Sequence, residues 1–555
     1  MNEIRENHQG SARWIVPLSA AAIAVCLFGI LGAIGLVGPD EPRYAWIARA
    51  MAGTGDWITP RLYGQPWFEK PILYYWAAAV GFLLHLPAEW AARLPSAFAA
   101  LAAALAIAWL AKKHYGGVPN SLSSPALLAP LFFSTSVAAV GFARSASPDM
   151  LFSACVTLAM ASAACVFRYS GALRETDPAP GVSRGDALPL VLFGAFLGLA
   201  VLAKGPAAIA LAGGAIGIWA MATKQWRVAF RLAHPFAIIA FCVVALPWYV
   251  LCAIRNPDFL RVFLWQHNFE RYVSPIFQHR QPFWYFGPII LLALLPWTAL
   301  LWPVAQEGLR LWRDKSWAKS PGFFFACWAV FPVLFFSVSQ SKLPGYILPA
   351  IPPLGLLFAI SIVRTTSGRG VNTRKILAGV GLTWVVVAIG AGFAKIPLVF
   401  RAGSDIPLPI NTFSAASAFI VAIVVLVVNY RGKPFLALLL CVVFVAAGVE
   451  IASLKLLPIL DPLVSARPHA EFMHNDLHPD RIFTYQLSRR WTYGLAFYFR
   501  RELSEWSPDD PRPALVLTTP DGLDRIRKLG RFSGELEEQQ PGLVYVPIAP
   551  MPVLR

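Results

Sequence analysis

Charged residues are scarce in this chain, and their scarcity excludes an ordinary soluble protein. Asp, Glu, Lys and Arg make up only 14% of the 555 residues, whereas soluble domains average about 25%. Hydrophobic residues account for 57% of the sequence, and the mean hydropathy is +0.57. Apolar runs of about 20 residues recur, and each is long enough to cross a bilayer core of roughly 30 Å. The sequence therefore predicts a polytopic α-helical membrane protein.

Cysteine is also rare, with seven residues, none of them in the last hundred positions. All seven fall in or at the ends of apolar segments, and no C-x-x-C pair is present. This pattern excludes a disulfide framework and a cysteine-based metal motif. The net charge is +17, but the Lys and Arg residues are spread through short loops between apolar runs. We therefore predict no nucleic-acid partner and attribute the positive charge to the positive-inside rule.

Thirteen apolar segments are predicted to be transmembrane helices. The first follows Arg13 and is too long for the core of a signal peptide, so we expect it to be retained. The aromatic-rich stretch 71–86 is short, and we predict that it lies at the membrane surface or enters only part-way. The predicted spans are 14–37, 92–112, 122–143, 149–168, 188–203, 206–222, 233–254, 284–304, 321–340, 346–363, 376–394, 412–430 and 434–452.

Basic residues in alternate loops predict which end of the bundle is cytoplasmic. With the N-terminus inside, every cytoplasmic loop carries at least two Lys or Arg residues, as the positive-inside rule requires. Counting 71–86 as a full span would invert every later loop and place these clusters outside, which is the weaker alternative. The opposite side of the membrane then holds the chain after Lys455, the segment "LAKGPA" (202–207) and the external loops 38–91, 144–149, 255–283 and 341–346.

Two domains are predicted. Residues 1–455 would form a transmembrane domain with its external loops, and residues 456–555 a small α/β domain outside the cytoplasm. In the tail, "RIFTYQL", "PALVLTT" and "GLVYVPI" read as short strands, and "WTYGLAFYFRREL" and "PDGLDRIRKL" as amphipathic helices.

The first external loop, "DEPRYAWIARAMAGTGDWITPRLYGQPWFEKP", concentrates ionisable groups. Asp40 has a structural explanation, because it precedes a run with helical spacing and could serve as an N-cap. Asp149, in "SASPDM", is likewise suited to the start of a helix. Lys70 could be an anchor in an aromatic belt. Lys204 lies between two short apolar helices, where a charge is costly unless it is paired or near the surface.

Cations and carboxylates on one membrane face suit the transfer of a sugar from a lipid phosphate. Cations stabilise the leaving phosphate, and a carboxylate acts near the incoming acceptor. Arg recognises phosphate in a bidentate manner, and Lys acts as a point charge. A transporter would favour a midplane site and repeat symmetry, neither of which is visible. A receptor or assembly factor would not need acids and bases on five separate segments.

The chain resembles the GT-C superfamily of integral-membrane glycosyltransferases, most of all the aminoarabinose transferases that modify lipid A, and it is related to protein O-mannosyltransferases. The resemblance runs from the first helix to the tail, and is densest in the first external loop and in "FFSVSQSKLPGYILPAIPPLGLL". The segments "FEKP" and "KLPGYILP" are more specific to the aminoarabinose branch.

This resemblance implies an inverting transfer, expected to move 4-amino-4-deoxy-L-arabinose from undecaprenyl phosphate to lipid A or another glycolipid acceptor. The reaction would occur at the periplasmic face of the bacterial inner membrane, on a monomer surrounded by membrane lipids. Because relatives also glycosylate polysaccharides or proteins, the acceptor stays open.

The resemblance also implies roles for individual residues. Asp40 and Asp149 take catalytic or acceptor-positioning roles. Glu69 and His267 resemble a divalent-metal site for Zn or Mg, although two ligands define no metal. The residues implied to contact the polyprenyl phosphate are Arg43, Tyr44, Lys70, Lys204, Arg271 and Tyr346. In the loop 255–283, Arg261 or Arg280 could take the role of Arg271.

Overall fold

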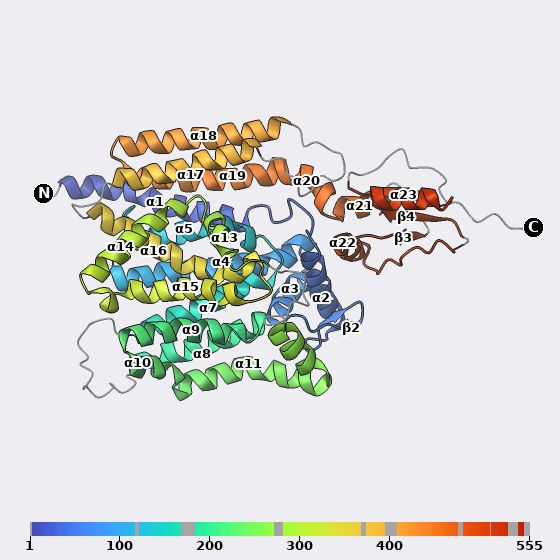
Figure 1. The fold of residues 1–555 in the computed structure, drawn as a ribbon, viewed down its shortest axis with the longest axis horizontal. Coiled ribbons are helices and arrows are strands. Elements are labelled where there is room, and N and C mark those ends of the chain that lie inside the picture. Colours follow the sequence, from blue (N-terminus) through green and yellow to red (C-terminus); the bar gives the residue numbers. More distant parts are fainter. Residues whose placement is uncertain are drawn as a thin grey trace, which may run out of the picture.

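The computed structural model consists of a long helical bundle with a small α/β unit at one end (Figure 1). Most bundle helices run roughly parallel to the long axis of the molecule, and the C-terminal unit, drawn in red, lies at the right-hand end. The structure describes residues 3–116, 121–167, 184–270, 281–367, 373–393, 408–474, 481–510, 512–530 and 542–548.

Long apolar helices build the bundle, because a helix satisfies its own backbone hydrogen bonds in lipid. Seven helices in the described part are long and apolar enough to cross a membrane, or nine if each of two bent pairs is one span. The seven comprise α4 (Ala88–Tyr115), α7 (Pro148–Val166), α8 (Arg184–Lys204), α11 (Pro235–Arg255), α15 (Pro321–Val338), η5 (Pro344–Ala350) with α16 (Ile351–Ser367), and α19 (Pro434–Ile451) with its extension.

Shorter helices fill the remaining predicted segments. Four apolar helices are shorter than a full span: Trp14–Phe28, Leu73–Leu83, Ala207–Thr223 and Ser414–Tyr430. A crossing at all thirteen predicted segments therefore stays a prediction. These and the connecting helices are α1 (Glu3–Phe28), α3 (Leu73–Leu83), α9 (Ala207–Thr223), α10 (Trp226–Phe230), η1 (Arg231–Ala233), η2 (Arg261–Glu270), η4 (Trp317–Lys319), α17 (Thr373–Phe393), α18 (Leu408–Tyr430), η6 (Ala452–Leu456) and α20 (Leu457–Val464).

Two helix pairs are bent instead of straight. The helices α5 (Pro125–Ser134) and α6 (Val137–Ala143) meet at 64°. The predicted span over 284–304 is broken: α13 (Phe286–Ala293) is followed at 110° by η3 (Thr298–Leu300) and α14 (Leu301–Arg313), so a crossing here stays a prediction. Pro296 lies in the break, and a proline has no N–H with which to continue the helical hydrogen bonds.

The predicted helix over 14–37 also ends early, at Phe28. Arg93 on α4 binds the segment that follows, because its guanidinium donates hydrogen bonds to backbone carbonyls beyond the helix. Its Nη1 lies 2.6 Å from the carbonyl oxygen of Leu31, and its Nη2 lies 2.7 Å from that of Gly35. Without this buried side chain, the carbonyls would need hydrogen-bond donors from further turns of helix or from water.

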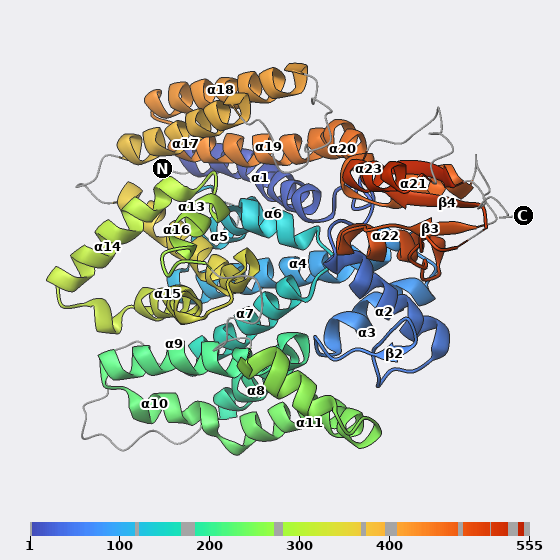
Figure 2. The ribbon, with the colours of Figure 1, turned by 45° about the vertical axis from the view of Figure 1, so that its right-hand side comes forward.

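The first external loop forms its own small layer at the end of the bundle that carries the C-terminal unit (Figure 2). It contains α2 (Asp40–Thr54), the antiparallel pair β1 (Arg61–Leu62) and β2 (Gln65–Pro66), and α3. Gly55 closes α2 with φ of 72°, in the left-handed region that glycine adopts without strain. The tyrosines 74 and 75 of α3 are buried against α2 and α4.

The C-terminal unit contains the strands and helices that the tail sequence predicts. Its sheet has the order β3 (Ile482–Thr484), β4 (Ala514–Thr518) and β5 (Val544–Ile548). The strand β4 runs parallel to β3 and antiparallel to β5. The unit also holds α21 (Arg467–Phe472), α22 (Arg489–Phe499) and α23 (Pro520–Lys528). Trp491, Leu517 and Tyr545 are buried together in one of its apolar clusters.

The C-terminal unit is fastened to the segment that follows α1. Asp461 Oδ1 accepts from the backbone N of Gly35 at 2.8 Å, and the Tyr498 hydroxyl accepts from that of Leu36 at 2.8 Å. The same hydroxyl donates to Glu89 Oε1 at 2.7 Å. A Cβ on Gly35 would lie 2.2 Å from Ser465 Oγ, so only glycine permits this close approach.

Candidate functional site

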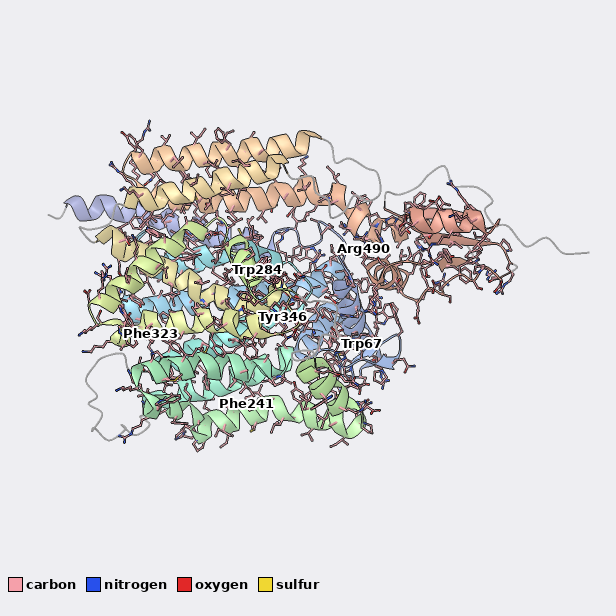
Figure 3. The ribbon with its side chains drawn as sticks, viewed as in Figure 1. Trp67, Phe241, Trp284, Phe323, Tyr346 and Arg490 are labelled. Carbon is pink, nitrogen blue, oxygen red and sulfur yellow. The ribbon has the colours of Figure 1, made fainter. Side chains whose placement is uncertain are left out.

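A cavity of about 420 Å³ lies where the first external loop meets α7, α8 and η5. Apolar side chains of Phe152, Phe335 and Phe336 form part of its wall. Figure 3 labels Tyr346 on the yellow part of the bundle and Trp67 on the blue first loop. Five of the candidates chosen from the sequence line this cavity: Glu69, Lys70, Lys204, His267 and Tyr346. Segments far apart in the sequence therefore converge on one concave site, as a ligand pocket requires.

Lys204 is the last residue of α8 and forms an ion pair with Asp149, at the start of α7. Its Nζ also lies 4.8 Å from the ring centroid of Tyr346 and 5.6 Å from that of Phe152. A charge at the end of an apolar helix is tolerated when it has such a partner. Ser147 Oγ accepts from the backbone N of Asp149, so the predicted helix start is confirmed while the carboxylate points to Lys204.

Gly345 allows the "KLPGYILP" segment to pass close to this ion pair. A Cβ at position 345 would lie 2.9 Å from Phe142 and 3.2 Å from Asp149 Cγ. A larger residue would therefore require the segment or the Phe142 ring to shift. The glycine therefore serves close packing, and its neighbour Tyr346 reaches the cavity as a result.

Arg43 lies at the centre of a second charged network. Its Nη2 lies 2.5 Å from Asp40 Oδ1 and 3.0 Å from Glu69 Oε2. Glu69 Oε1 in turn lies 3.4 Å from Lys70 Nζ at the cavity wall. Burial alone would lower the pKa of Arg43, but Glu69, Tyr44 and Asp40 outweigh it and raise that pKa above its ordinary value. The guanidinium is therefore a permanent charge that fixes both carboxylates.

Aromatic rings surround the Arg43 guanidinium, which is only 8% exposed. The ring centroids of Tyr44, Trp67 and Tyr493 lie 5.3, 5.5 and 5.7 Å from its Cζ. Cation–π contacts of this kind are strongest when the cation is desolvated. Tyr493 belongs to α22, so the C-terminal unit reaches the charged network directly.

Asp40 does not act as the N-cap of α2. Pro39 occupies the N-cap position and makes no side-chain cap bond, and Asp40 lies in the first turn with its carboxylate on Arg43. The Asp40 side chain is 57% exposed, whereas Asp149 is ion-paired beside the cavity. The two candidate carboxylates therefore occupy different environments.

The candidate metal pair does not form a recognisable metal site. Within the part of the chain that the structure describes, no group of three or more His, Cys, Asp or Glu side chains could hold an ion. Glu69 and His267 both line the cavity, but the two oxygens of Glu69 already face Arg43 and Lys70. Two ligands fall short of the four that zinc needs. The metal therefore stays a prediction.

Arg271 lies outside the described residues, as does Arg280, so neither is placed in the site. Arg261 is described, and its side chain is 63% exposed and paired with Asp258 at 3.0 Å. It lies on η2, the helix that also carries His267.

Sequence reasoning missed the buried pair formed by Glu41 and Arg93. Glu41 Oε2 accepts from Arg93 Nη2 at 2.7 Å, and its Oε1 accepts from the backbone N of Ala146 at 2.7 Å. Ala146 belongs to the "SASPDM" segment, so this carboxylate joins two of the external loops. The available signal in the sequence was that Glu41 lies next to Asp40 in the densest charged segment. The sequence did not indicate which of these two acids is buried.

Lys342 is a second residue that sequence reasoning left out. Its Nζ donates to the backbone carbonyls of Ser339 at 2.5 Å and Gln281 at 3.1 Å, and the residue is 5% exposed. Burial lowers the pKa of Lys342 below its ordinary value. Ser339 and Ser341 line the cavity, so Lys342 shapes its rim. The "KLPGYILP" motif contained this lysine and was the available signal.

The fold and the site together define a class: a multi-pass helical membrane protein whose cations and carboxylates gather around one cavity. Residues 14–263 match the family described as dolichyl-phosphate-mannose-protein mannosyltransferase.

Two sequence relatives are more specific than this family match. The chain is 36% identical over 361 residues to the undecaprenyl phosphate-alpha-4-amino-4-deoxy-L-arabinose arabinosyl transferase of Edwardsiella ictaluri, covering 65% of this chain and 61% of the relative. It is 33% identical over 351 residues to the transferase of the same name from Erwinia tasmaniensis, covering 63% and 59%. The match thus spans less than two thirds of these relatives' length.

A solved structure agrees over nearly the whole chain. The crystal structure of ArnT from Cupriavidus metallidurans bound to undecaprenyl phosphate matches with a TM-score of 0.75 at 23% identity, covering 97% of this chain and 98% of that one. The predicted resemblance is therefore confirmed: the chain has the fold of this ArnT structure, and over 65% of its length it is similar in sequence to the arabinosyl transferase of Edwardsiella ictaluri.

Proposed function

We propose that this chain is an inverting glycosyltransferase that moves 4-amino-4-deoxy-L-arabinose from undecaprenyl phosphate to lipid A or a related glycolipid. The observation that carries the proposal is the cavity in which Lys70 and Lys204 face a space of about 420 Å³ lined by Tyr346. Two lysines beside an apolar wall suit a phosphate attached to a lipid chain. The names of the sequence relatives support the choice of donor and sugar.

The phosphate of the donor would be held by Lys70 and Lys204, with the Tyr346 hydroxyl as a hydrogen-bond donor. Asp149 is already bound to Lys204, so its proposed role is to position that ammonium group. Arg43 would act indirectly, because it forms an ion pair with Glu69, and Glu69 also pairs with Lys70. The cations would act most strongly as negative charge develops on the departing phosphate oxygen.

In the proposed step, an acceptor oxygen attacks the anomeric carbon from the side opposite the phosphate. The bond between that carbon and the phosphate oxygen breaks, and both electrons leave with undecaprenyl phosphate. A hydroxyl acceptor loses its proton to a carboxylate, for which we propose Asp40. Both carboxylates are ion-paired, Asp40 with Arg43 and Asp149 with Lys204. The greater exposure of the Asp40 side chain, 57% against 22% for Asp149, supports this assignment.

The proposed location is the bacterial inner membrane, with thirteen spans and with the cavity and residues 456–555 on the periplasmic side. The basic loops support this orientation, because they lie at the opposite end from the cavity in the predicted topology. The cavity-lining first loop and the C-terminal unit also share one end of the bundle (Figure 2). The proposed working unit is a monomer in contact with membrane lipids.

A protein acceptor is a second candidate, favoured by the match of residues 14–263 to a protein mannosyltransferase family. The test therefore offers both acceptors to the purified chain in lipid nanodiscs, together with undecaprenyl-phosphate-linked aminoarabinose. Mass spectrometry of lipid A and of an unfolded Ser/Thr-rich peptide would detect the added sugar. We expect modified lipid A; modified peptide alone would establish the second candidate, and neither product with an intact donor would refute the transferase.

A matched pair of variants tests the proposed base. Asp40→Asn should lower the transfer rate by roughly 10²-fold or more, because it removes a proton acceptor but keeps the shape. Asp56→Asn makes the same change in the same loop, where Asp56 Oδ1 accepts from the backbone N of Ile58 and Thr59. An amide oxygen retains those bonds, so Asp56→Asn should stay near the wild-type rate. Equal rates for both variants would disprove the assignment of Asp40.

A further inference from the structure

A second cavity, of about 660 Å³, lies between α17 and α18. Its wall contains Arg374 and Lys375 from the start of α17, Tyr430 from the end of α18, and Arg431 immediately after it. From this end, α19 runs to α20, which adjoins the C-terminal unit (Figure 1). The cavity therefore lies at the end of the bundle remote from the candidate active site.

Three cations meet in this cavity, and acidic residues are almost absent from the surrounding sequence. Between Asp314 and Glu450, the chain contains a single acid, Asp405. The described residues that line the cavity include no carboxylate. Like charges gathered without an acid repel one another, and an anionic ligand removes that repulsion.

Asn429 supplies an independent sign of a ligand. Its Nδ2 donates to the backbone carbonyl of Arg374 at 2.8 Å, which fixes the orientation of the amide. The residue lines the cavity and is only 3% exposed, and its Oδ1 has no hydrogen-bond partner among the described residues. A buried acceptor without a donor destabilises the folded chain, because it has lost its hydrogen bonds to water. The cavity therefore offers three cations for an anion and one acceptor for a hydroxyl group.

The walls next to the cations are apolar. Ala378, Leu426 and Val427 complete the lining. On the outer faces of the same two helices, Leu382 and Val386 of α17 and Ile420 and Ile423 of α18 are exposed. In a membrane protein such faces contact lipid, so the cations lie above a surface suited to acyl chains.

We propose that this cavity binds an anionic phospholipid whose head group carries a free hydroxyl, such as phosphatidylglycerol. The phosphate would lie among Arg374, Lys375 and Arg431, and a head-group hydroxyl would donate to Asn429 Oδ1. Basic pockets between transmembrane helices are suited to anionic head groups. Tyr430 already contacts the cation cluster, because Arg374 Cζ lies 5.9 Å from its ring centroid.

The simpler explanation is that these cations only reflect the positive-inside rule, which requires charge but no particular site. A matched control separates the two explanations. Replacing Arg374, Lys375 and Arg431 with Gln removes three charges from the cavity. Replacing Arg313, Lys315 and Lys319 with Gln removes three exposed charges from the loop after α14, on the same predicted cytoplasmic side.

The measurement is native mass spectrometry of the purified full-length chain with phosphatidylglycerol, with phosphatidylcholine and with inorganic phosphate. We expect wild type to retain phosphatidylglycerol in preference to phosphatidylcholine. The cavity variant should bind it more weakly by about tenfold or more, since three basic residues that attract the anionic head group are lost. The loop variant should keep wild-type binding. The single variant Arg431→Gln, which disturbs the fold least, should show a smaller loss in the same direction.

Three outcomes would overturn the proposal. An equal loss in the cavity and loop variants would show unspecific surface attraction. Equal retention of phosphatidylcholine would show that charge does not select the lipid. Displacement of the lipid by inorganic phosphate would show that the cavity is a site for free phosphate. Binding of undecaprenyl phosphate should be unchanged in the cavity variant, which separates this site from the proposed donor site.

Discussion

Lys204 on α8 donates a hydrogen bond to Asp149 on α7, so the cation at the cavity wall is held by a carboxylate from the neighbouring helix. Each residue restricts the other, and their effects on ligand binding should therefore be coupled.

The first prediction concerns the binding of undecaprenyl phosphate. Lys204→Ala and Lys70→Ala should each weaken it by about tenfold or more, because charge-assisted hydrogen bonds contribute roughly 1.5–3 kcal/mol. Asp149→Asn should weaken it less, since the ammonium group remains but loses its support. In a double-mutant cycle followed by tryptophan fluorescence, the Asp149→Asn/Lys204→Ala variant should bind no worse than Lys204→Ala. Additive losses would show that Asp149 acts independently of Lys204.

The second prediction concerns the buried pair of Glu41 and Arg93. Arg93→Met should destabilise the chain by roughly 3–5 kcal/mol, because it leaves a buried carboxylate without its cation. Adding Glu41→Gln should recover part of the loss, since the uncompensated charge is then gone. Thermal melting in detergent with size-exclusion chromatography would measure both variants. A double variant less stable than Arg93→Met would contradict the assigned role of the charge.

The third prediction is a pH dependence of the C-terminal unit. His469 is fully buried. Its Nε2 lies 2.8 Å from the carbonyl oxygen of Pro462, which can only accept, so Nε2 carries the proton. The other ring nitrogen, Nδ1, therefore accepts a hydrogen bond from the Tyr545 hydroxyl at 2.6 Å. Burial lowers the pKa of His469 from 6.5 to about 4. The unfolded chain therefore binds a proton at higher pH than the folded chain, and stability falls as the pH drops from 6.5 towards 4.

The expected slope is about 1.4 kcal/mol per pH unit in that window, with no contribution from this group above pH 6.5. Fluorescence of Trp491, whose ring centroid lies 5.1 Å from that of His469, would report the unfolding of this unit. In His469→Gln the slope between pH 6.5 and 4 should be smaller. An unchanged slope would assign the pH dependence to other groups.

The fourth prediction concerns orientation in the membrane. Single cysteines at Gln65 and Ser504, both exposed, should react with a membrane-impermeant thiol reagent in intact cells. A cysteine at the exposed Ser121 should be protected, because it lies at the predicted cytoplasmic end. The native cysteines, none of which is exposed, would first be replaced. Labelling at Ser121 with protection at the other two positions would invert the topology and refute the proposed function.

The helices and the tail strands could be predicted because apolar length and alternation are local properties. The sequence also predicted that Lys70, Lys204 and Tyr346 lie at one face of the membrane, since basic clusters in alternate loops assigned their segments to one side. Their common cavity is visible only in the structure. The roles of these residues remain predictions. The sequence indicated only the region in which each candidate lies, because each is a charged or aromatic residue at the end of an apolar run.

The features that the sequence did not predict depend on contacts between residues far apart in the chain. The carbonyls that follow the early end of α1 at Phe28 are bound by Arg93, a residue of another helix. The choice of Glu41 over Asp40 as the buried acid depends on the backbone of Ala146. Tyr493 reaches Arg43 only because the C-terminal unit packs against the first loop. No local pattern contains these distances.

The attachment of the C-terminal unit has a consequence for synthesis. Gly35 and Leu36, near the beginning of the chain, are bonded by Asp461 and Tyr498, near its end. A ribosome makes the first loop hundreds of residues before its partners, so most of the bundle is inserted while this loop still lacks them. The charged network around Arg43 is therefore completed only after nearly the whole protein has been translated. A prematurely terminated chain would carry the lysines of the cavity yet lack the Tyr493 ring beside Arg43.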